Sequence, residues 1–189
     1  MFTTVKKSYV QAGQGKNAGL FILNKEVQAP GIELRGTLTA INFSFNEGSE
    51  SENVRPCDVI ELCMATQDGE NVSFSLPLRN ATAAQFVCQA PDINYPFINF
   101  SLKSEKTDKG AITSIFVKVR SDENEAAAAR NCKRPYTQIK NKKGITEFYA
   151  TKPAADKNTP RERIGEPILV EQILNELCDL LNIPFTDAR

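Results

Sequence analysis

Alternating hydrophobic and polar residues run through most of the first 120 positions. Such alternation is typical of β-strands that bury one face. It predicts strands over residues 32–45, 59–65, 72–76, 95–103 and 112–120. The short apolar run 19–24 predicts a leading strand, whereas the polar residues 1–17 are expected to form a loose arm.

The longest of these segments changes phase along its length. Apolar residues occupy positions 32, 34, 38 and 40 and then positions 41, 43 and 45, so the alternation shifts between Ala40 and Ile41. A one-residue shift exchanges the two faces of a strand unless a β-bulge absorbs it. Gly36 supplies a place for the strand to bend. The segment is therefore predicted to be long and bent and to contribute to two sheets.

One helix interrupts the strands. Residues 77–90 carry an apolar stripe at helical spacing, with Asn80 as the predicted N-cap and Pro91 just beyond the end. Three strands precede this helix and two follow it. The order β-β-β-α-β-β is that of the OB-fold, a five-stranded barrel that often binds oligonucleotides. We therefore predict a mainly β chain, with a five-stranded OB-like barrel and an N-terminal arm in residues 1–125.

Two further units follow the predicted barrel. Residues 136–140 and 145–149 flank a polar turn and predict an added basic hairpin, within an extension over 126–163 that ends in a linker. Residues 167–181 place apolar side chains at i, i+3, i+4, i+7, i+8 and i+11. The last unit, 164–189, is therefore expected to be a C-terminal amphipathic helix.

The composition limits the possible chemistry mainly because the chain lacks certain residue types and motifs. The chain has no histidine, and its five cysteines lack close-paired spacing. The commonest general base and the usual zinc ligand are thus absent, and an odd cysteine count favours reduced thiols. No apolar run reaches the roughly 18 residues of a membrane-spanning helix, and a signal-peptide core is lacking. We expect a cytoplasmic protein that is not an enzyme and uses no metal or cofactor.

Charge is unevenly distributed although the net charge is zero. Residues 1–102 carry a net charge of −3, residues 103–163 carry +7, and residues 164–189 carry −4. A basic middle segment favours an anionic partner. The alternative interpretation is a solvated surface of uneven composition.

Two groups of residues are candidates for nucleic-acid binding, because aromatic rings stack on bases while lysine and arginine contact phosphates. The first group lies on the fourth and fifth strands and the loop between them: Phe97, Lys103, Lys106, Lys109, Phe116, Lys118 and Arg120. The second group lies in the added hairpin: Lys133, Arg134, Tyr136, Lys140, Lys142, Lys143 and Phe148, with Tyr149 as the alternative to Phe148. Two other interpretations stay open. Phe97 and Phe116 can instead pack beneath other elements, and Tyr136 and Phe148 can form a cross-strand pair.

The layout resembles that of bacteriophage-type single-stranded DNA-binding proteins. The shared features are the β-β-β-α-β-β core over residues 31–120, a lysine-bearing hairpin between its last two strands, and a basic segment with the pair Tyr136 and Thr137. The resemblance implies sequence-tolerant binding that coats and protects single strands in replication and recombination. DNA is the favoured partner, but the sequence does not distinguish it from RNA, since contacts to the 2′-hydroxyl are not readable.

A structural or assembly protein of a virion or scaffold is the alternative hypothesis. In that case the apolar stripe of the final helix would associate with another copy of the chain. A homo-oligomer or a replication-protein partner bound through this helix is compatible with the first hypothesis too. No membrane partner is expected.

Overall fold

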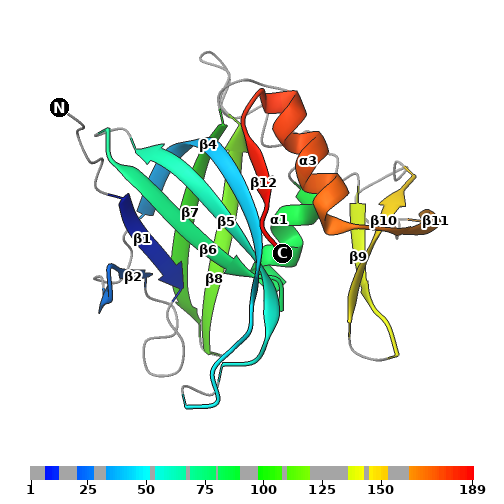
Figure 1. Ribbon diagram of the computed structural model, residues 1–189, viewed down its shortest axis with the longest axis horizontal. Helices are drawn as coiled ribbons and strands as arrows, with labels where there is room; N and C mark the ends of the chain where they lie inside the picture. The colour runs from blue at the N-terminus through cyan, green and yellow to red at the C-terminus, as the bar shows by residue number, and fades with distance from the viewer. Residues whose placement is uncertain are drawn as a thin grey trace.

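The structure is a computed structural model, and it describes residues 7–12, 21–27, 33–51, 54–66, 69–79, 81–89, 98–107, 110–119, 136–142, 145–152 and 162–189. These residues form a large sheet, a separate three-stranded sheet and the helices α1 and α3 (Figure 1). The predicted mainly β character and C-terminal helix are confirmed.

The large sheet has the strand order β3-β2-β1-β6-β5-β4-β7-β8, and β12 pairs with β4. Its strands are β1 (Lys7–Ala12), β2 (Phe21–Leu23), β3 (Glu26–Val27), β4 (Glu33–Asn46), β5 (Cys57–Thr66), β6 (Asn71–Pro77), β7 (Ile98–Thr107), β8 (Gly110–Val119) and β12 (Phe185–Asp187). All five strands that the alternation predicted for the barrel are present, together with the short leading strand, which is β2.

β4 is the long, bent strand that its sequence predicts. Its register with β5 shifts between Leu38 and Ala40, close to the predicted phase change. Buried side chains accordingly pass from Leu38 to Ile41 and Phe43. Along its other edge, β4 pairs with β7 near its start and with β12 beyond the bulge. One strand therefore pairs with two neighbours along the same edge. The prediction that it contributes to two sheets was wrong, because all of its partners belong to the large sheet.

The prediction of a closed five-stranded barrel was wrong for the described strands, which form an open sheet. Closure of the five central strands would require β6 to pair with β8. Instead, the outer edge of β6 pairs in parallel with β1, from Lys7 opposite Asn71 to Val10 opposite Phe74. The prediction of a loose arm was wrong for residues 7–12. Their polar sequence gives little local signal, and the strand depends on pairing with a distant edge.

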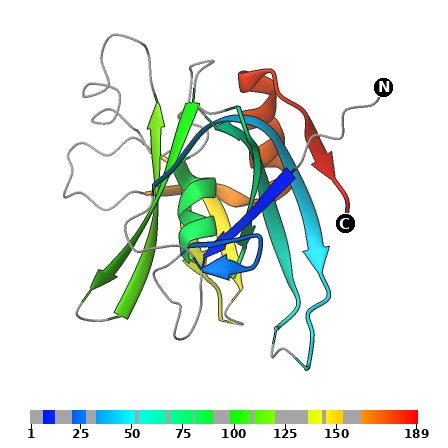
Figure 2. The same ribbon diagram turned by 90° about the vertical axis from the view of Figure 1, so that its left-hand side faces the viewer.

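α1 (Ala81–Gln89) lies inside the curve of the sheet. Figure 2 shows it between the β7–β8 hairpin and strands β4, β5 and β6. Its buried residues are Ala83, Ala84, Phe86, Val87 and Cys88. The helix is shorter than predicted, because Pro77 still pairs with Val59 in the sheet. The predicted N-cap, Asn80, lies outside the described residues.

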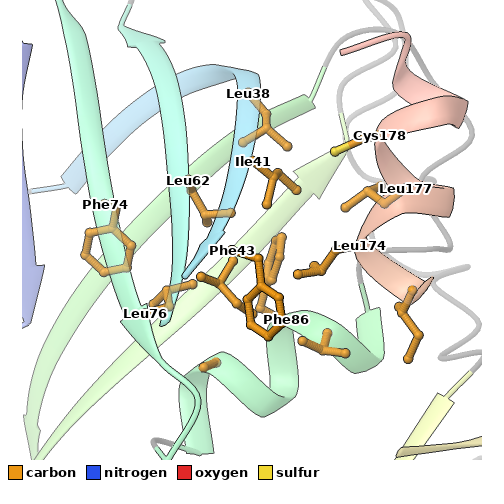
Figure 3. Packing of buried hydrophobic residues seen from close by; sticks show 14 of the residues in the cluster. Leu38, Ile41, Phe43, Leu62, Phe74, Leu76, Phe86, Leu174, Leu177 and Cys178 are labelled. Carbon is orange, nitrogen blue, oxygen red and sulfur yellow. The ribbon is translucent and has the colours of Figure 1, made fainter. Parts of the chain in front are cut away.

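A single core joins the sheet to both helices. In Figure 3, Phe43 and Leu62 of the sheet lie near Phe86 of α1, with Leu174 and Leu177 of α3 beside them. The alternating residues that predicted β5 and β6 are buried as expected: Ile60, Leu62, Met64, Val72, Phe74 and Leu76. Burial of each such side chain contributes roughly 1.5–3 kcal/mol, so this core fixes α3 to the sheet.

α3 (Val170–Leu181) carries the predicted apolar stripe, and the chain itself covers that stripe. Ile173, Leu174, Leu177 and Cys178 are buried. Asn182 adopts a left-handed conformation, with φ of 53°, and ends the helix. The chain then turns back as β12, which the sequence did not predict.

The second sheet has the order β11-β10-β9, with β9 (Tyr136–Lys140), β10 (Thr146–Thr151) and β11 (Arg163–Ile168). β9 and β10 confirm the predicted hairpin. β11 replaces the predicted start of the last helix at residue 167. It was missed because Gly165 and Pro167 are poor strand formers, which are tolerated at a sheet edge.

Candidate nucleic-acid interface

The first candidate group lies partly on the β7–β8 hairpin. Leu102 pairs with Ile115, and both belong to the predicted apolar row of the hairpin. Lys103, Phe116 and Lys118 belong to the other row of alternating positions. This backbone register agrees with the predicted division of the two strands into apolar and basic positions. Phe97, Lys109 and Arg120 lie outside the described residues.

The sequence predicts a loop position for Lys106, and this prediction was wrong. β7 continues to Thr107, which pairs with Gly110, and Lys106 pairs with Ala111. The loop is therefore shorter than expected because strand pairing extends further. Lys106 follows the alternation of Leu102 rather than that of Lys103, so it belongs to a different row from the basic positions of the hairpin.

The three-stranded sheet is fixed to the body of the protein through one face. Phe148 is only 1% exposed and belongs to the core cluster. The prediction that it stacks on a base was wrong, because its ring is enclosed by the chain. The cross-strand alternative was wrong too, since Phe148 pairs with Gln138, and Tyr136 pairs with Ala150.

Tyr136 attaches the same face to α3. Its half-buried ring packs against the core, and its hydroxyl donates a hydrogen bond to Oε2 of Glu176 at 3.2 Å. Burial raises the pKa of Tyr136, and the neighbouring Glu176 carboxylate raises it further. The phenol therefore stays protonated at neutral pH and keeps its donor.

The opposite face of this sheet carries Tyr149, the second aromatic residue considered for stacking. Neighbouring residues in a strand point to opposite faces, so burial of Phe148 turns Tyr149 and Glu147 outward. The Tyr149 hydroxyl donates to Oε2 of Glu147 at 2.8 Å, and the guanidinium of Arg163 lies 5.4 Å from the ring centroid. Arg163 was missed because residues near it predicted a linker and a helix start.

The Glu147 carboxylate is held from two sides. Asn141 Nδ2 donates to its Oε1 at 2.7 Å, and Tyr149 occupies Oε2. These two hydrogen bonds, with that of Asn141 contributing most, lower the pKa of Glu147. The bond to Glu147 in turn raises the pKa of Tyr149. At neutral pH the pair is thus an ionised carboxylate and a neutral phenol.

Two lysines lie at the turn that closes β9 and β10. Lys140 and Lys142 are exposed, and among the described residues neither has a carboxylate within ion-pair distance. The turn is fixed by Asn141, whose N–H donates to the carbonyl of Ile145 at 2.9 Å. Lys152, by contrast, pairs with Glu162 at 2.9 Å. Lys133, Arg134 and Lys143 of this group lie outside the described residues.

The face of β5 and β6 that carries Glu61 and the buried Ser73 does not share this basic character. Glu61 accepts hydrogen bonds from the Ser73 hydroxyl and from Asn42 Nδ2, the latter at 3.2 Å. In OB-folds the second and third strands contribute to oligonucleotide binding. Here the corresponding strands carry a hydrogen-bonded carboxylate, so we place the candidate interface on the three-stranded sheet and the β7–β8 hairpin.

Within the described residues, no cluster of cysteine, aspartate and glutamate is arranged to hold a metal ion, and no helix has the length and hydrophobicity of a membrane span. Burial raises the pKa of Cys178 to about 11, so its thiol stays protonated. Comparisons with protein-family models, curated proteins and solved structures gave no match to this chain.

Proposed function

We propose that the protein binds single-stranded nucleic acid, with DNA favoured, and coats it without strong sequence dependence. One observation carries the proposal: the outward face of the three-stranded sheet carries Tyr149 beside Arg163, and the exposed Lys140 and Lys142 lie at the β9–β10 turn of the same sheet, with Lys140 in the other row of β9. An aromatic ring among cations is the chemistry that binds single strands. Bases stack on the ring, and the cations contact phosphates.

The arrangement of the large sheet supports the same proposal. Strands β4 to β8 keep the chain order β-β-β-α-β-β, with α1 between β6 and β7. Their spatial order is β6-β5-β4-β7-β8, and the bulged β4 lies at its centre. We propose an OB-like sheet that is opened by the insertion of β1 beside β6. Residues 103–163, with a net charge of +7, include the second half of β7, all of β8, β9 and β10, and Arg163 at the start of β11.

The binding surface would be largely preformed. Phe148 and Tyr136 fix the three-stranded sheet to the core and to α3, so its outward face is held by packing rather than by the ligand. Preorganisation lowers the entropic cost of binding. A charged surface of this kind is expected to bind more weakly as salt concentration rises.

The assembly hypothesis relied on a free apolar stripe on the final helix. In the structure, Ile173, Leu174 and Leu177 of that stripe are buried within the chain. We therefore favour nucleic-acid binding as the proposed function. Its basis is a binding surface, and it includes no catalytic step.

The test is fluorescence anisotropy with a labelled oligo-dT of about 30 nucleotides, long enough for more than one binding site. The titration is run at about 50 mM and about 200 mM salt, with a duplex of equal length as the control. The proposal predicts tight, salt-sensitive binding to the single strand and weaker binding to the duplex. Absence of binding at low salt, or equal affinity for the duplex, would contradict it.

A further inference from the structure

Resting on the proposed function, we infer that Glu147 makes the surface prefer bases that carry an exocyclic amine, so that cytosine binds more tightly than thymine. The inference concerns the class of base rather than a sequence motif. It starts from the position of a carboxylate at the edge of the only aromatic ring that the described residues place on this face of the sheet.

The carboxylate is fixed in place but retains acceptor capacity. Asn141 donates to Oε1 and Tyr149 donates to Oε2, at 2.7 Å and 2.8 Å. A carboxylate offers about four lone-pair positions, and these two bonds use one on each oxygen. An ionised carboxylate has no proton to donate, so a further ligand group must be a donor.

A base stacked on Tyr149 lies next to this carboxylate, because the phenolic hydroxyl of the same ring reaches Oε2 of Glu147. Cytosine presents its N4 amine as a donor, and glutamate accepts from that group in direct base recognition. Thymine presents the O4 carbonyl at the same position. Two acceptors then face each other, and no hydrogen bond can form between them.

The positive charges near Glu147 allow this carboxylate to lie close to the negatively charged nucleic-acid backbone. Arg163 lies over the Tyr149 ring, and Lys140 and Lys142 flank the adjoining turn. Cations near the ring can meet the phosphates while Glu147 meets the base. The carboxylate is therefore expected to discriminate between bases without abolishing binding.

The experiment measures the affinities of oligo-dC and oligo-dT of about 30 nucleotides at neutral pH, because these pyrimidines differ at the position of the amine. We expect about three- to tenfold tighter binding of oligo-dC, below the discrimination of a bidentate pair. Glu147→Gln should bring the ratio close to one, because a glutamine amide can donate to O4 as well as accept from an amine. The matched control is Glu162→Gln, an exposed carboxylate of the same region, which should keep the wild-type ratio.

Tyr149→Phe supplies a second, independent variant. It keeps the ring and frees Oε2 of Glu147, so the preference for oligo-dC should persist or increase. Equal wild-type affinities for the two oligonucleotides, or an unchanged ratio in Glu147→Gln, would overturn the inference and leave the proposed function standing. Failure of the wild-type protein to bind either oligonucleotide would overturn both.

Discussion

The guanidinium of Arg189 lies over the ring of Phe43, 4.3 Å from its centroid. The same guanidinium forms ion pairs with Asp187 at 2.7 Å and with Glu171 of α3 at 3.0 Å. The Ala188 N–H donates to the carbonyl of Phe43 at 2.8 Å. These contacts connect the last residues of the chain to the central strand β4 and to α3, so the C-terminal segment is part of the folded body.

Arg189→Gln should therefore destabilise the protein. The change removes a cation–π contact on a buried ring and two partly exposed ion pairs, and we expect a loss of about 1 kcal/mol in the free energy of unfolding. Urea denaturation measures this loss. The control is Lys152→Gln, whose exposed ion pair with Glu162 should cost less than about 0.5 kcal/mol. Equal losses in the two variants would show that the Arg189 contacts add nothing.

Acid stability should depend on Asp187. The hydrogen bond from Arg189 lowers the pKa of this carboxylate below its ordinary value of 3.8. A group with a lowered pKa in the folded state stabilises the protein above its unfolded pKa, and this contribution disappears as pH falls through the folded value. The melting temperature of the wild type should thus fall more steeply below pH 3.8 than that of Asp187→Asn. Parallel profiles for the two proteins would refute this assignment.

The Tyr136 hydroxyl should stabilise the attachment of the three-stranded sheet to α3. Tyr136→Phe keeps the packed ring and removes the hydrogen bond to Glu176, so we expect a loss of about 0.5–1.5 kcal/mol in urea denaturation. Tyr149→Phe is the matched control, because its hydroxyl contacts Glu147 within the same strand. A larger loss in the control than in Tyr136→Phe would contradict the structural role given to Tyr136.

Phosphate contacts by the turn lysines should appear in the salt dependence of binding. For single strands, the slope of log affinity against log salt changes by about 0.7 for each contact. Lys140→Gln with Lys142→Gln should therefore reduce the slope by about 1.4 in an anisotropy titration. Lys25→Gln changes an exposed lysine between β2 and β3 and should leave the slope unchanged. A slope that responds equally to Lys25 would mean that only overall charge matters.

Tyr149, rather than Phe148, should provide the stacking ring. Tyr149→Leu is expected to weaken binding of oligo-dT by about 1–3 kcal/mol, whereas Tyr149→Phe should retain most of the affinity because stacking needs only the ring. Phe148→Leu should lower the melting temperature, since the side chain is buried, with little change in affinity at a temperature where the protein is folded. A larger loss of affinity in Phe148→Leu than in Tyr149→Leu would contradict this assignment and would indicate that Phe148 stacks on the bases.

The local sequence pattern predicted those strands whose own residues alternate between apolar and polar. Ile60, Leu62 and Met64 alternate in the sequence and are buried on one face of β5. The phase change in β4 likewise indicated either an exchange of the buried face or a bulge, and the register with β5 shows the bulge. These features needed no knowledge of the partner strand.

Elements that depend on distant partners were missed. Strand β1 gains its pairing from β6. Strand β12 gains its pairing from β4, after only a short turn that follows α3. Which of Phe148 and Tyr149 is available for stacking also depended on distant partners. Either face of β10 could have been buried, and packing of the three-stranded sheet against the core decided that Phe148 is enclosed.

The most direct test of the binding surface is photo-crosslinking of an oligo-dT that contains 5-iodouracil, followed by mass spectrometry of the protein peptides. A halogenated base couples to an aromatic ring on which it stacks. We predict a crosslink on Tyr149 that excess unlabelled single strand removes and excess duplex does not. Crosslinks confined to peptides outside the three-stranded sheet and the β7–β8 hairpin, or removed equally by the duplex, would contradict the proposed interface.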